Sequence, residues 1–397
     1  MLILNITGMS ENERTVVKPG EIIRPYIDLD IVKEVSKRLY DLEVLDGKEL
    51  NSYDDRNYHI HVSTKTTNSH ITHVCFHGYV LKVLNSLDSR HEDYVEAQNG
   101  MILHVAEKGI STPRPVKNIN GELMSLESFP CDQNRSKSEI NLQCLVRLLE
   151  YIPGRILRGV PYTTSLLTQI GNMTGRLDNA LTDFQHPAHT RHRRIWNLTE
   201  VSDLRRFIYC IRDEDRSRLI QDVIHSFQSD VTKNYNLLKS GTLHADVNDY
   251  NILVSEQPTN GEYDVIGVLD FGDSVYSCYV FEIAIIMCYV ILESDVIDPI
   301  DAGGHTLAGF LQEFLLGRED LKVLKQCVCA RFAQSLVMGD YSAENDPENA
   351  EYVLSTAQKG WTTLKTLWQM SKQELYGRWS RICQEHYGID ANFGDDL

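Results

Sequence analysis

The chain has 397 residues and a formal net charge of -17 at pH 7, with 42% hydrophobic and 24% charged residues. These fractions are ordinary for a globular protein, and they exclude extended disorder along most of the chain. The charge disfavours nucleic acid and anionic membranes as partners, because both reward clustered Lys and Arg. It suits a small cationic substrate, an amine or a basic amino acid, better.

Neither the cysteines nor the apolar segments suggest an exported or membrane protein. The nine cysteines are scattered from Cys75 to Cys383 without paired spacing, so we expect reduced core thiols. The N-terminus has no basic region followed by a long apolar run, as a signal peptide would. Residues 280–292 are the most apolar run, but it contains Glu282 and is shorter than the roughly 18 residues of a membrane span. We therefore expect a cytoplasmic location.

The N-terminal third has the pattern of a strand-rich lobe. Residues 1–27 show no firm pattern, and we expect a tail. From Asp28 onward, apolar residues recur every fourth position up to Leu39, which predicts a helix. Residues 58–62 alternate as a strand does, so residues 52–57 would be the turn of a hairpin. In a nucleotide-binding lobe that turn would lie over the phosphates.

Residues 73–84 are the next strand candidate, and they contain Lys82. A lysine in such a run can simply point to solvent on an edge strand. Residues 91–108 follow with a helical pattern and carry Glu96, placed to meet a strand lysine across the lobe. We therefore expect a Lys82–Glu96 ion pair that holds the ammonium against the nucleotide phosphates, with Glu92 as the substitute if Glu96 faces water.

A change of pattern near residue 151 predicts a boundary between two lobes. Residues 142–151 are strand-like, and Pro153-Gly154 then suits a hinge. We expect a small nucleotide-binding lobe over residues 28–151 and a large catalytic and substrate-binding lobe over residues 152–397. Helices are predicted in the large lobe at 164–184, 203–211, 217–238, 279–293, 307–316 and 321–338, with two more between 349 and 386.

Residues 240–273 carry the strongest chemical motif. His244 and Asp246 form a His-x-Asp pair, and Asn251 follows five residues later. A β-prone run then ends at Asp270 in an Asp-Phe-Gly-Asp sequence. Asp246 can accept a substrate proton, while Asn251 and Asp270 offer the oxygen ligands that Mg²⁺ prefers. A buried polar turn is the alternative, but the occurrence of all these residues in this order favours phosphoryl transfer.

A second group of histidines is not expected to bind a metal. His186, His189 and His192 recur every third residue around a proline and beside several arginines. A proline-broken loop with nearby cations is a poor preformed metal site. We expect a solvated loop here.

Several motifs, taken together and in order, resemble the aminoglycoside phosphotransferase family. They are Ser52-Tyr53-Asp54-Asp55-Arg56-Asn57-Tyr58, Val80-Leu81-Lys82-Val83, Leu145-Val146-Arg147-Leu148-Leu149 with Pro153-Gly154-Arg155, the His244 loop, and Leu269-Asp270-Phe271-Gly272-Asp273. The resemblance implies an α+β, bilobal, protein-kinase-like fold. Its small lobe would have an antiparallel sheet plus a helix, its larger lobe would be mainly helical, and the activity would be phosphorylation of a small-molecule hydroxyl.

The resemblance also implies roles for individual residues. Asp246 would be the base, in a loop held by His244, with Asn251 and Asp270 as Mg²⁺ ligands. The nucleotide would be bound by Tyr53, Asp54, Asn57, Lys82 and Glu96. Two departures from the family pattern are visible: the turn at 52–57 contains no glycine, and Ala245 stands where the family usually has glycine. Alanine costs little there unless the position requires a positive φ.

A closer similarity within the family is carried by residues 279–282, 303–310 and 334–338. It implies GTP as the phosphoryl donor, with ATP possible, and 5-hydroxy-L-lysine as the acceptor, giving 5-phosphooxy-L-lysine and GDP in lysine breakdown. Another amino alcohol or an aminoglycoside-like amine is the alternative acceptor, and a kinase-derived binding protein without catalysis is a further alternative.

Such an acceptor has two ammonium groups and one carboxylate, so its pocket should contain acids and a cation. We expect the acids to be Asp273, Glu293 and Asp295, and the cation to be Arg331. The alternative for Arg331 is a structural ion pair with Glu282.

Overall fold

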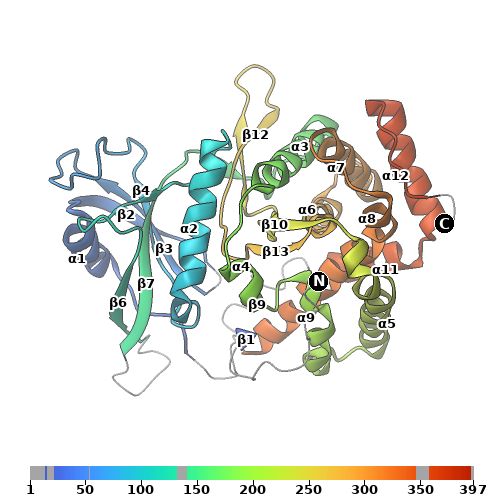
Figure 1. Ribbon diagram of the computed structural model, residues 1–397, viewed down its shortest axis with the longest axis horizontal. Coiled ribbons are helices and arrows are strands. Elements are labelled where there is room, and N and C mark those ends of the chain that lie inside the picture. Colours follow the sequence, from blue (N-terminus) through green and yellow to red (C-terminus); the bar gives the residue numbers. More distant parts are fainter. Residues whose placement is uncertain (1–13, 16–21, 53, 132–140, 346–356, 395–397) are drawn as a thin grey trace.

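The computed structural model describes residues 14–15, 22–52, 54–131, 141–345 and 357–394, which form two lobes (Figure 1). The predicted α+β bilobal fold is confirmed, with an antiparallel sheet in the small lobe and mostly helices in the large lobe. The elements of the small lobe are α1 (Leu29–Tyr40), β2 (Val44–Leu50), β3 (Arg56–Val62), β4 (Tyr79–Val83), η2 (Asp88–Arg90), α2 (Glu92–Glu107), β5 (Pro115–Val116), β6 (Ser125–Pro130) and β7 (Asn141–Glu150).

The small lobe is built on a sheet of strand order β2-β3-β4-β7-β5, in which β6 also pairs with β7 and every pairing is antiparallel. Leu81 and Val83 belong to the hydrophobic core between α1 and the sheet. Because side chains alternate along a strand, Lys82 points to the other face. There it is in register with Asn57 of β3 and Arg147 of β7.

Helix α1 begins as the predicted pattern requires. Asp28 caps its N-terminus by accepting a hydrogen bond from the backbone N–H of Ile31 at 2.9 Å. Val32, Val35 and Leu39 then form the buried stripe that packs on the sheet. Helix α2 lies between this sheet and the large lobe (Figure 1).

The large lobe surrounds the catalytic segment with helices. Residues 14–15 form the short strand β1, which pairs with β9 (Arg193–Arg194). The elements are β8 (Arg155–Ile156), α3 (Thr164–Leu181), α4 (Ala188–Arg191), β9 (Arg193–Arg194), η3 (Leu198–Arg206), η4 (Ile208–Cys210), α5 (Glu214–Asp230), η5 (Thr232–Leu237), β10 (Ser240–Leu243), β11 (Ile252–Glu256), β12 (Tyr263–Val268), β13 (Val275–Cys278), α6 (Tyr279–Glu293), α7 (Pro299–Glu313), α8 (Arg318–Lys322), α9 (Leu324–Asn345), α11 (Ala357–Gln369) and α12 (Lys372–Tyr387).

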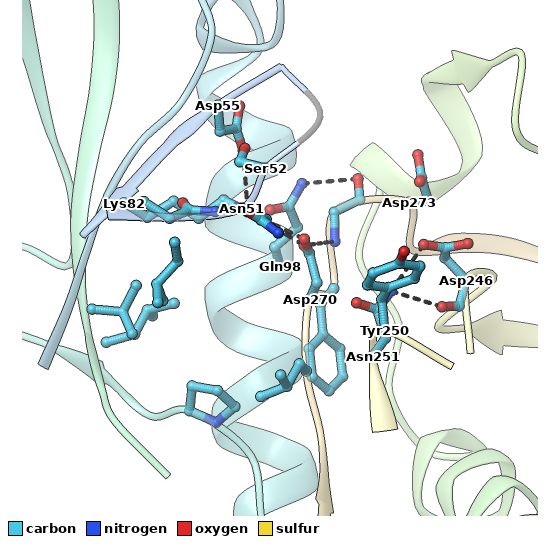
Figure 2. A pocket seen from close by; sticks show the side chains of 18 of the residues that line it. Asn51, Ser52, Asp55, Lys82, Gln98, Asp246, Tyr250, Asn251, Asp270 and Asp273 are labelled. Atoms are coloured by element: carbon cyan, nitrogen blue, oxygen red, sulfur yellow. Dashed lines mark hydrogen bonds and ion pairs between the residues drawn. The ribbon is translucent and has the colours of Figure 1, made fainter. Parts of the chain in front are cut away.

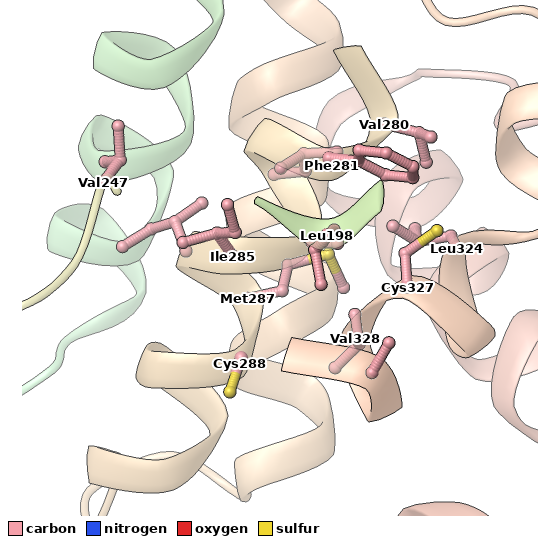
Figure 3. Close-up of a cluster of buried hydrophobic side chains, with 14 of the residues drawn as sticks. Leu198, Val247, Val280, Phe281, Ile285, Met287, Cys288, Leu324, Cys327 and Val328 are labelled. Carbon is pink, nitrogen blue, oxygen red and sulfur yellow. The ribbon is translucent and has the colours of Figure 1, made fainter. Parts of the chain in front are cut away.

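Helix α6 forms the centre of the large-lobe core. Its side chains are apolar and buried on almost every side, as expected of a helix enclosed by others. Phe281 and Ile285 of α6 lie in one cluster with Leu324 and Val328 of α9 (Figure 3). Helix α9 thereby has a fixed position from which Arg331 reaches the catalytic segment.

Helices α3 and α7 approach each other closely through glycines. A Cβ atom on Gly171 would lie 2.0 Å from the carbonyl oxygen of Thr306, and one on Gly309 would lie 2.2 Å from that of Thr168. Both obstacles are backbone atoms, so a side chain could be accommodated only by separating the helices. The two glycines therefore set the spacing of this pair.

Several predicted boundaries were wrong. The strand predicted at 73–84 is limited to β4, and the helix predicted at 203–211 is two short 3₁₀ segments. Helix α7 starts at Pro299 rather than at residue 307, because Asp298 caps it and proline suits the first helical position. Strand β6 was not predicted.

All nine cysteines are free, and seven are buried, in agreement with the predicted core thiols.

Within the described residues, no helix is both long enough and apolar enough to cross a membrane.

Candidate active site

A cleft of about 710 Å³ lies between the lobes and collects the motif residues. Figure 2 shows Asp55 and Lys82 on one side of it, Asp246 and Asn251 on the other, and Asp270 between them. Its volume falls in the range of small-molecule sites.

His244 fixes the loop that carries Asp246. Its Nε2 lies 2.8 Å from the carbonyl oxygen of Leu269, and the backbone N–H of Asp246 donates to its Nδ1 at 3.2 Å. Since a carbonyl only accepts and an N–H only donates, the imidazole is neutral with its proton on Nε2. His244 thus ties the Asp246 loop to the strand end that leads into Asp270.

Ala245 adopts a left-handed conformation with φ 64°. The position therefore does require positive φ, and alanine is strained there where glycine would not be. A hydrogen bond to Glu282 of α6 stabilises this strained conformation. The two carboxylate oxygens of Glu282 lie 3.1 and 2.9 Å from the backbone N–H of Ala245, which donates to them. Burial raises the pKa of Glu282, and hydrogen bonds from the backbone at Ala245 and His244 oppose that rise.

Asp246 is held by two side chains. Its Oδ1 lies 2.6 Å from an NH2 donor of Arg331, and its Oδ2 accepts from Nδ2 of Asn251 at 2.9 Å. Burial raises the pKa of Asp246 to about 7, with the charges of Asp273 and Asp270 acting in the same direction and Arg331 opposing them. A carboxyl with a pKa close to neutral is suited to general base catalysis.

Arg331 does not pair with Glu282, so the predicted structural alternative was wrong. Besides Asp246, it donates to the hydroxyl of Tyr289 at 3.1 Å and to Oε1 of Gln334 at 3.0 Å. Its guanidinium also lies over the rings of Trp196 and Tyr289. With its side chain only 2% exposed, Arg331 is fixed as the partner of the candidate base.

Asn251 directly precedes β11 and Asp270 follows its partner strand β12, and the backbone N–H of Leu269 donates to the carbonyl oxygen of Asn251 at 2.7 Å. Asp270, at φ 53°, lies with Oδ2 3.3 Å from Nζ of Lys82. Burial raises its pKa, but the positive charges of Lys82 and Arg147 prevail and bring the pKa of Asp270 to about 2. Asp270 is therefore ionised, and Asn251, whose amide nitrogen is used on Asp246, presents its oxygen. This pair fits a hard divalent cation such as Mg²⁺.

Lys82 does not pair with Glu96, and the predicted ion pair was wrong. Glu96 and its substitute Glu92 are both exposed on α2. Nζ of Lys82 instead lies 3.1 Å from Oδ2 of Asp55, within the turn before β3, and near Asp270. The anionic partner therefore comes from the phosphate-facing turn rather than from the helix.

A second buried cation accompanies Lys82. Arg147 is in register with Lys82 on the neighbouring strand, and its NH1 donates to Oδ1 of Asn99 on α2 at 3.0 Å. Burial lowers its pKa, while Asp270 and Asp55 raise it. Two adjacent cations thus face the cleft from the sheet.

The remaining predicted nucleotide residues lie around the turn at 52–57. Tyr53 is outside the described residues. Burial and the charges of Asp55 and Asp88 raise the pKa of Asp54 to about 7. Oδ1 of Asn57 is buried, with no hydrogen-bond partner in the described part of the chain. Asp54 and Asn57 both line the cleft.

The predicted substrate residues are only partly brought together. Asp273 and Arg331 line the cleft, whereas Glu293 and Asp295 do not. Oε1 of Glu293 lies 3.4 Å from NH1 of Arg158, and Asp295 is exposed. Asp273 is paired with Arg194 at 2.7 Å.

The loop that contains His186, His189 and His192 was predicted to be solvated, but part of it is buried. His189 is buried, and its Nε2 lies 3.1 Å from Oγ of Ser274, directly after the Asp-Phe-Gly-Asp sequence. Burial lowers its pKa to about 4, which leaves it neutral. The part of the loop around His189 therefore packs against the catalytic segment.

No individual role was predicted for Asp55, Arg147 or Arg194, although Asp55 and Arg147 lie within the motifs that carry the resemblance. Arg147 carried a usable signal, because a charged residue inside a strand of buried apolar residues needs a partner. Asp55 and Arg194 carried none, since an acidic turn and an arginine-rich loop are common on surfaces.

The chain matches the model of the phosphotransferase enzyme family over residues 46–323. It is also 36% identical over 379 residues to a hydroxylysine kinase of Xenopus laevis, covering 94% of this chain and 97% of that protein. These matches confirm the family indicated by the motifs.

Two solved structures share the fold. A microcompartment-associated aminopropanol kinase superposes with a TM-score of 0.62 at 16% identity, covering 89% of this chain and all (100%) of the other. An amicoumacin kinase in complex with AMP-PNP, Ca²⁺ and its ligand superposes with a TM-score of 0.57 at 18% identity, covering 84% of this chain and 94% of the other.

Proposed function

Because the chain belongs to the aminoglycoside phosphotransferase family, we propose that it transfers the γ-phosphoryl group of GTP to the 5-hydroxyl of 5-hydroxy-L-lysine. The products are 5-phosphooxy-L-lysine and GDP, within lysine breakdown. At the coarser level, the protein is a phosphotransferase that acts on an alcohol group of a small molecule. The observation that carries the finer proposal is the similarity to a hydroxylysine kinase over 94% of the chain.

Asp246 acts as the base toward the acceptor hydroxyl. Its Oδ1 is engaged by Arg331 and its Oδ2 by Asn251, so the carboxylate has one orientation in the cleft. A fixed acceptor of this kind positions the attacking oxygen and removes its proton as transfer proceeds. This role is supported by the raised pKa of Asp246.

Asn251 and Asp270 hold Mg²⁺, which when bound supplies positive charge to neutralise the phosphates. Lys82, with Arg147 beside it, binds the nucleotide phosphates from the sheet. Asp54 and Asn57 contribute to the nucleotide site from the turn at residues 52–57, and the family resemblance implies the same role for Tyr53.

GTP is the proposed donor, and ATP is the alternative. The triphosphate would enter a cleft that contains many carboxylates, among them Asp54, Asp55 and Asp270. An anion is repelled by such a site unless a cation accompanies it. We therefore expect nucleotide binding to depend strongly on Mg²⁺.

The amino groups of the acceptor face acidic and aromatic side chains. Asp273 and the rings of Tyr250, Tyr289 and Trp196 line the cleft near Asp246. Carboxylates and aromatic faces both stabilise ammonium groups, although the guanidinium of Arg331 already lies over the rings of Trp196 and Tyr289. Arg331 can receive the acceptor's carboxylate only in competition with Asp246, to which it is already bound.

The acceptor is tested by incubating the purified protein with hydroxylated amines, each with Mg²⁺ and either GTP or ATP. The panel contains 5-hydroxy-L-lysine, lysine as the control without a hydroxyl, aminopropanol and an aminoglycoside. Mass spectrometry should detect phosphorylated 5-hydroxylysine, formed faster with GTP than with ATP, and no product from lysine.

Other outcomes separate the alternatives. Product from aminopropanol or the aminoglycoside but not from 5-hydroxylysine would replace the acceptor and keep the chemistry. Nucleotide binding without any phosphorylated product would favour a binding protein derived from a kinase.

A further inference from the structure

Arg194 of β9 bridges the two sides of the cleft. Its NH1 and NH2 groups lie 2.8 and 3.2 Å from the two carboxylate oxygens of Asp88, in η2 of the small lobe. Its Nε lies 2.7 Å from Oδ1 of Asp273, beside the Asp-Phe-Gly segment. The three side chains are only 21%, 18% and 18% exposed, so water screens these contacts less than it screens a surface pair.

Asp88 is linked to Lys82 through two more residues. Oδ2 of Asp88 accepts from Nδ2 of Asn85 at 2.8 Å. Asn85 also donates to Oδ1 of Asp55, through its backbone N–H at 2.9 Å and its side chain at 3.1 Å. Oδ2 of Asp55 then lies 3.1 Å from Nζ of Lys82. A continuous polar chain therefore runs from Lys82 to Arg194, and every member lines the cleft.

The other end of this polar chain is attached to the backbone around Asp273. The Arg194 guanidinium lies 5.8 Å from the ring centre of Tyr94 on α2. The hydroxyl of Tyr94 donates to the carbonyl oxygen of Ser274 at 2.7 Å and lies 3.2 Å from that of Gly272. Arg194 and Tyr94 together thus hold the small lobe against the segment that follows Asp270.

We propose that Arg194 is a positioning residue for phosphoryl transfer, which couples Lys82 in the small lobe to the Asp270–Asp273 segment through Asp88. Lys82 and Asp270 must engage the same nucleotide from different lobes. They are in direct contact at 3.3 Å, and the polar chain adds a second, buried link between the lobes, so that binding of the phosphates does not require the lobes to be ordered first. Asp273 is then bound to Arg194, and it meets an ammonium group of the acceptor only while keeping this partner. This inference rests on the proposed function, because it assumes a Mg²⁺-nucleotide in the cleft.

The test is a double-mutant cycle on nucleotide affinity, measured with a fluorescent GTP analogue and Mg²⁺. Arg194→Gln and Asp88→Asn should each weaken nucleotide binding by roughly 10-fold. Because both remove the same contact, the affinity of the double variant should be no lower than that of the single variant with the lower affinity. Arg194→Lys should not restore affinity, because one ammonium cannot reproduce the two hydrogen bonds to Asp88 together with the ionic contact to Asp273. The readout needs no acceptor, so it is independent of whether 5-hydroxylysine is the substrate.

Arg191→Gln is the matched control. Arg191 also crosses between the lobes, 2.6 Å from Asp93 on α2, but the two side chains are 61% and 40% exposed. This exposed pair should matter little, and affinity should stay within about twofold of wild type. Thermal unfolding of every variant shows whether the fold is intact. If Arg194→Gln proves unstable, Asp88→Asn still tests the contact, because asparagine keeps the shape of the aspartate side chain.

Two results would overturn the inference: wild-type affinity in folded Arg194→Gln or Asp88→Asn, or losses that multiply in the double variant. Turnover of an acceptor is measured alongside. If wild type binds nucleotide and the cycle is non-additive while 5-hydroxylysine is not phosphorylated, the proposed acceptor fails and the role of Arg194 stands.

Discussion

Arg331 of α9 places an NH2 donor 2.6 Å from Oδ1 of Asp246, so the candidate base is paired with a buried cation supplied by a helix 85 residues further along the chain. The pairing orients the carboxylate and opposes the effect of burial on its pKa. Substitution of Arg331 should therefore change the pH dependence of the reaction and not only its rate.

The first prediction concerns that pH dependence. A base must be deprotonated to act, and the pKa of Asp246 is raised to about 7, so kcat should rise with pH through about 7. Arg331→Met removes the charge that lowers this pKa, and the midpoint should move to higher pH by about 1–3 units. Arg331→Lys keeps a charge and should shift it less. An unchanged midpoint in Arg331→Met, measured over pH 5.5–9.5, would show that Arg331 does not tune the base.

The second prediction distinguishes two candidate partners of Lys82. Asp55→Asn removes the carboxylate that holds the Lys82 ammonium at 3.1 Å, and the KM for nucleotide should increase by roughly 10-fold, because the lost position of Lys82 outweighs the lower negative charge of the cleft. Glu96 is exposed on α2, so Glu96→Gln should leave steady-state kinetics as in wild type. The reverse ranking of the two variants would restore the Lys82–Glu96 pair.

The third prediction concerns the strained alanine of the catalytic loop. Ala245 has φ 64°, which glycine adopts without steric cost. Ala245→Gly should raise the free energy of unfolding by about 1 kcal/mol, measured by urea denaturation, and keep activity. Ala245→Val should lower it, because a β-branched residue is strongly disfavoured at positive φ. Equal stability of the glycine and valine variants would contradict the strain.

The fourth prediction tests the close approach of α3 and α7. Gly309→Ala would place Cβ 2.2 Å from the carbonyl oxygen of Thr168, and it should destabilise the protein by about 1–3 kcal/mol or more. Gly377 in α12 has open space around it, so Gly377→Ala should stabilise by up to about 1 kcal/mol through helix propensity. A neutral Gly309→Ala would mean that the two helices can separate without cost.

The sequence predicted the fold class because the motifs occur in family order and the strand and helix periods are clear in both lobes. It also identified the residues that the structure brings together at the cleft, namely Asp246, Asn251, Asp270 and Lys82. Their spacing along the chain was sufficient to predict that they meet, because Asp246 and Asn251 lie in one loop and Asp270 follows a nearby strand.

The partners of these residues could not be predicted in the same way. Lys82 pairs with Asp55 rather than Glu96 because of where α2 lies relative to the sheet, which is a tertiary property. Arg331 reaches Asp246 across 85 residues of sequence, and Arg194 reaches Asp88 across 106. Such pairs depend on helix packing, and a single sequence has no local pattern that records it.

The central claim, that Asp246 is the base of a small-molecule phosphotransferase, is tested most directly by product formation in Asp246→Asn. With 5-hydroxylysine, GTP and Mg²⁺, turnover should fall by roughly 10²–10⁴-fold while the fold and nucleotide affinity are largely retained. Undiminished turnover in the folded variant would contradict the account.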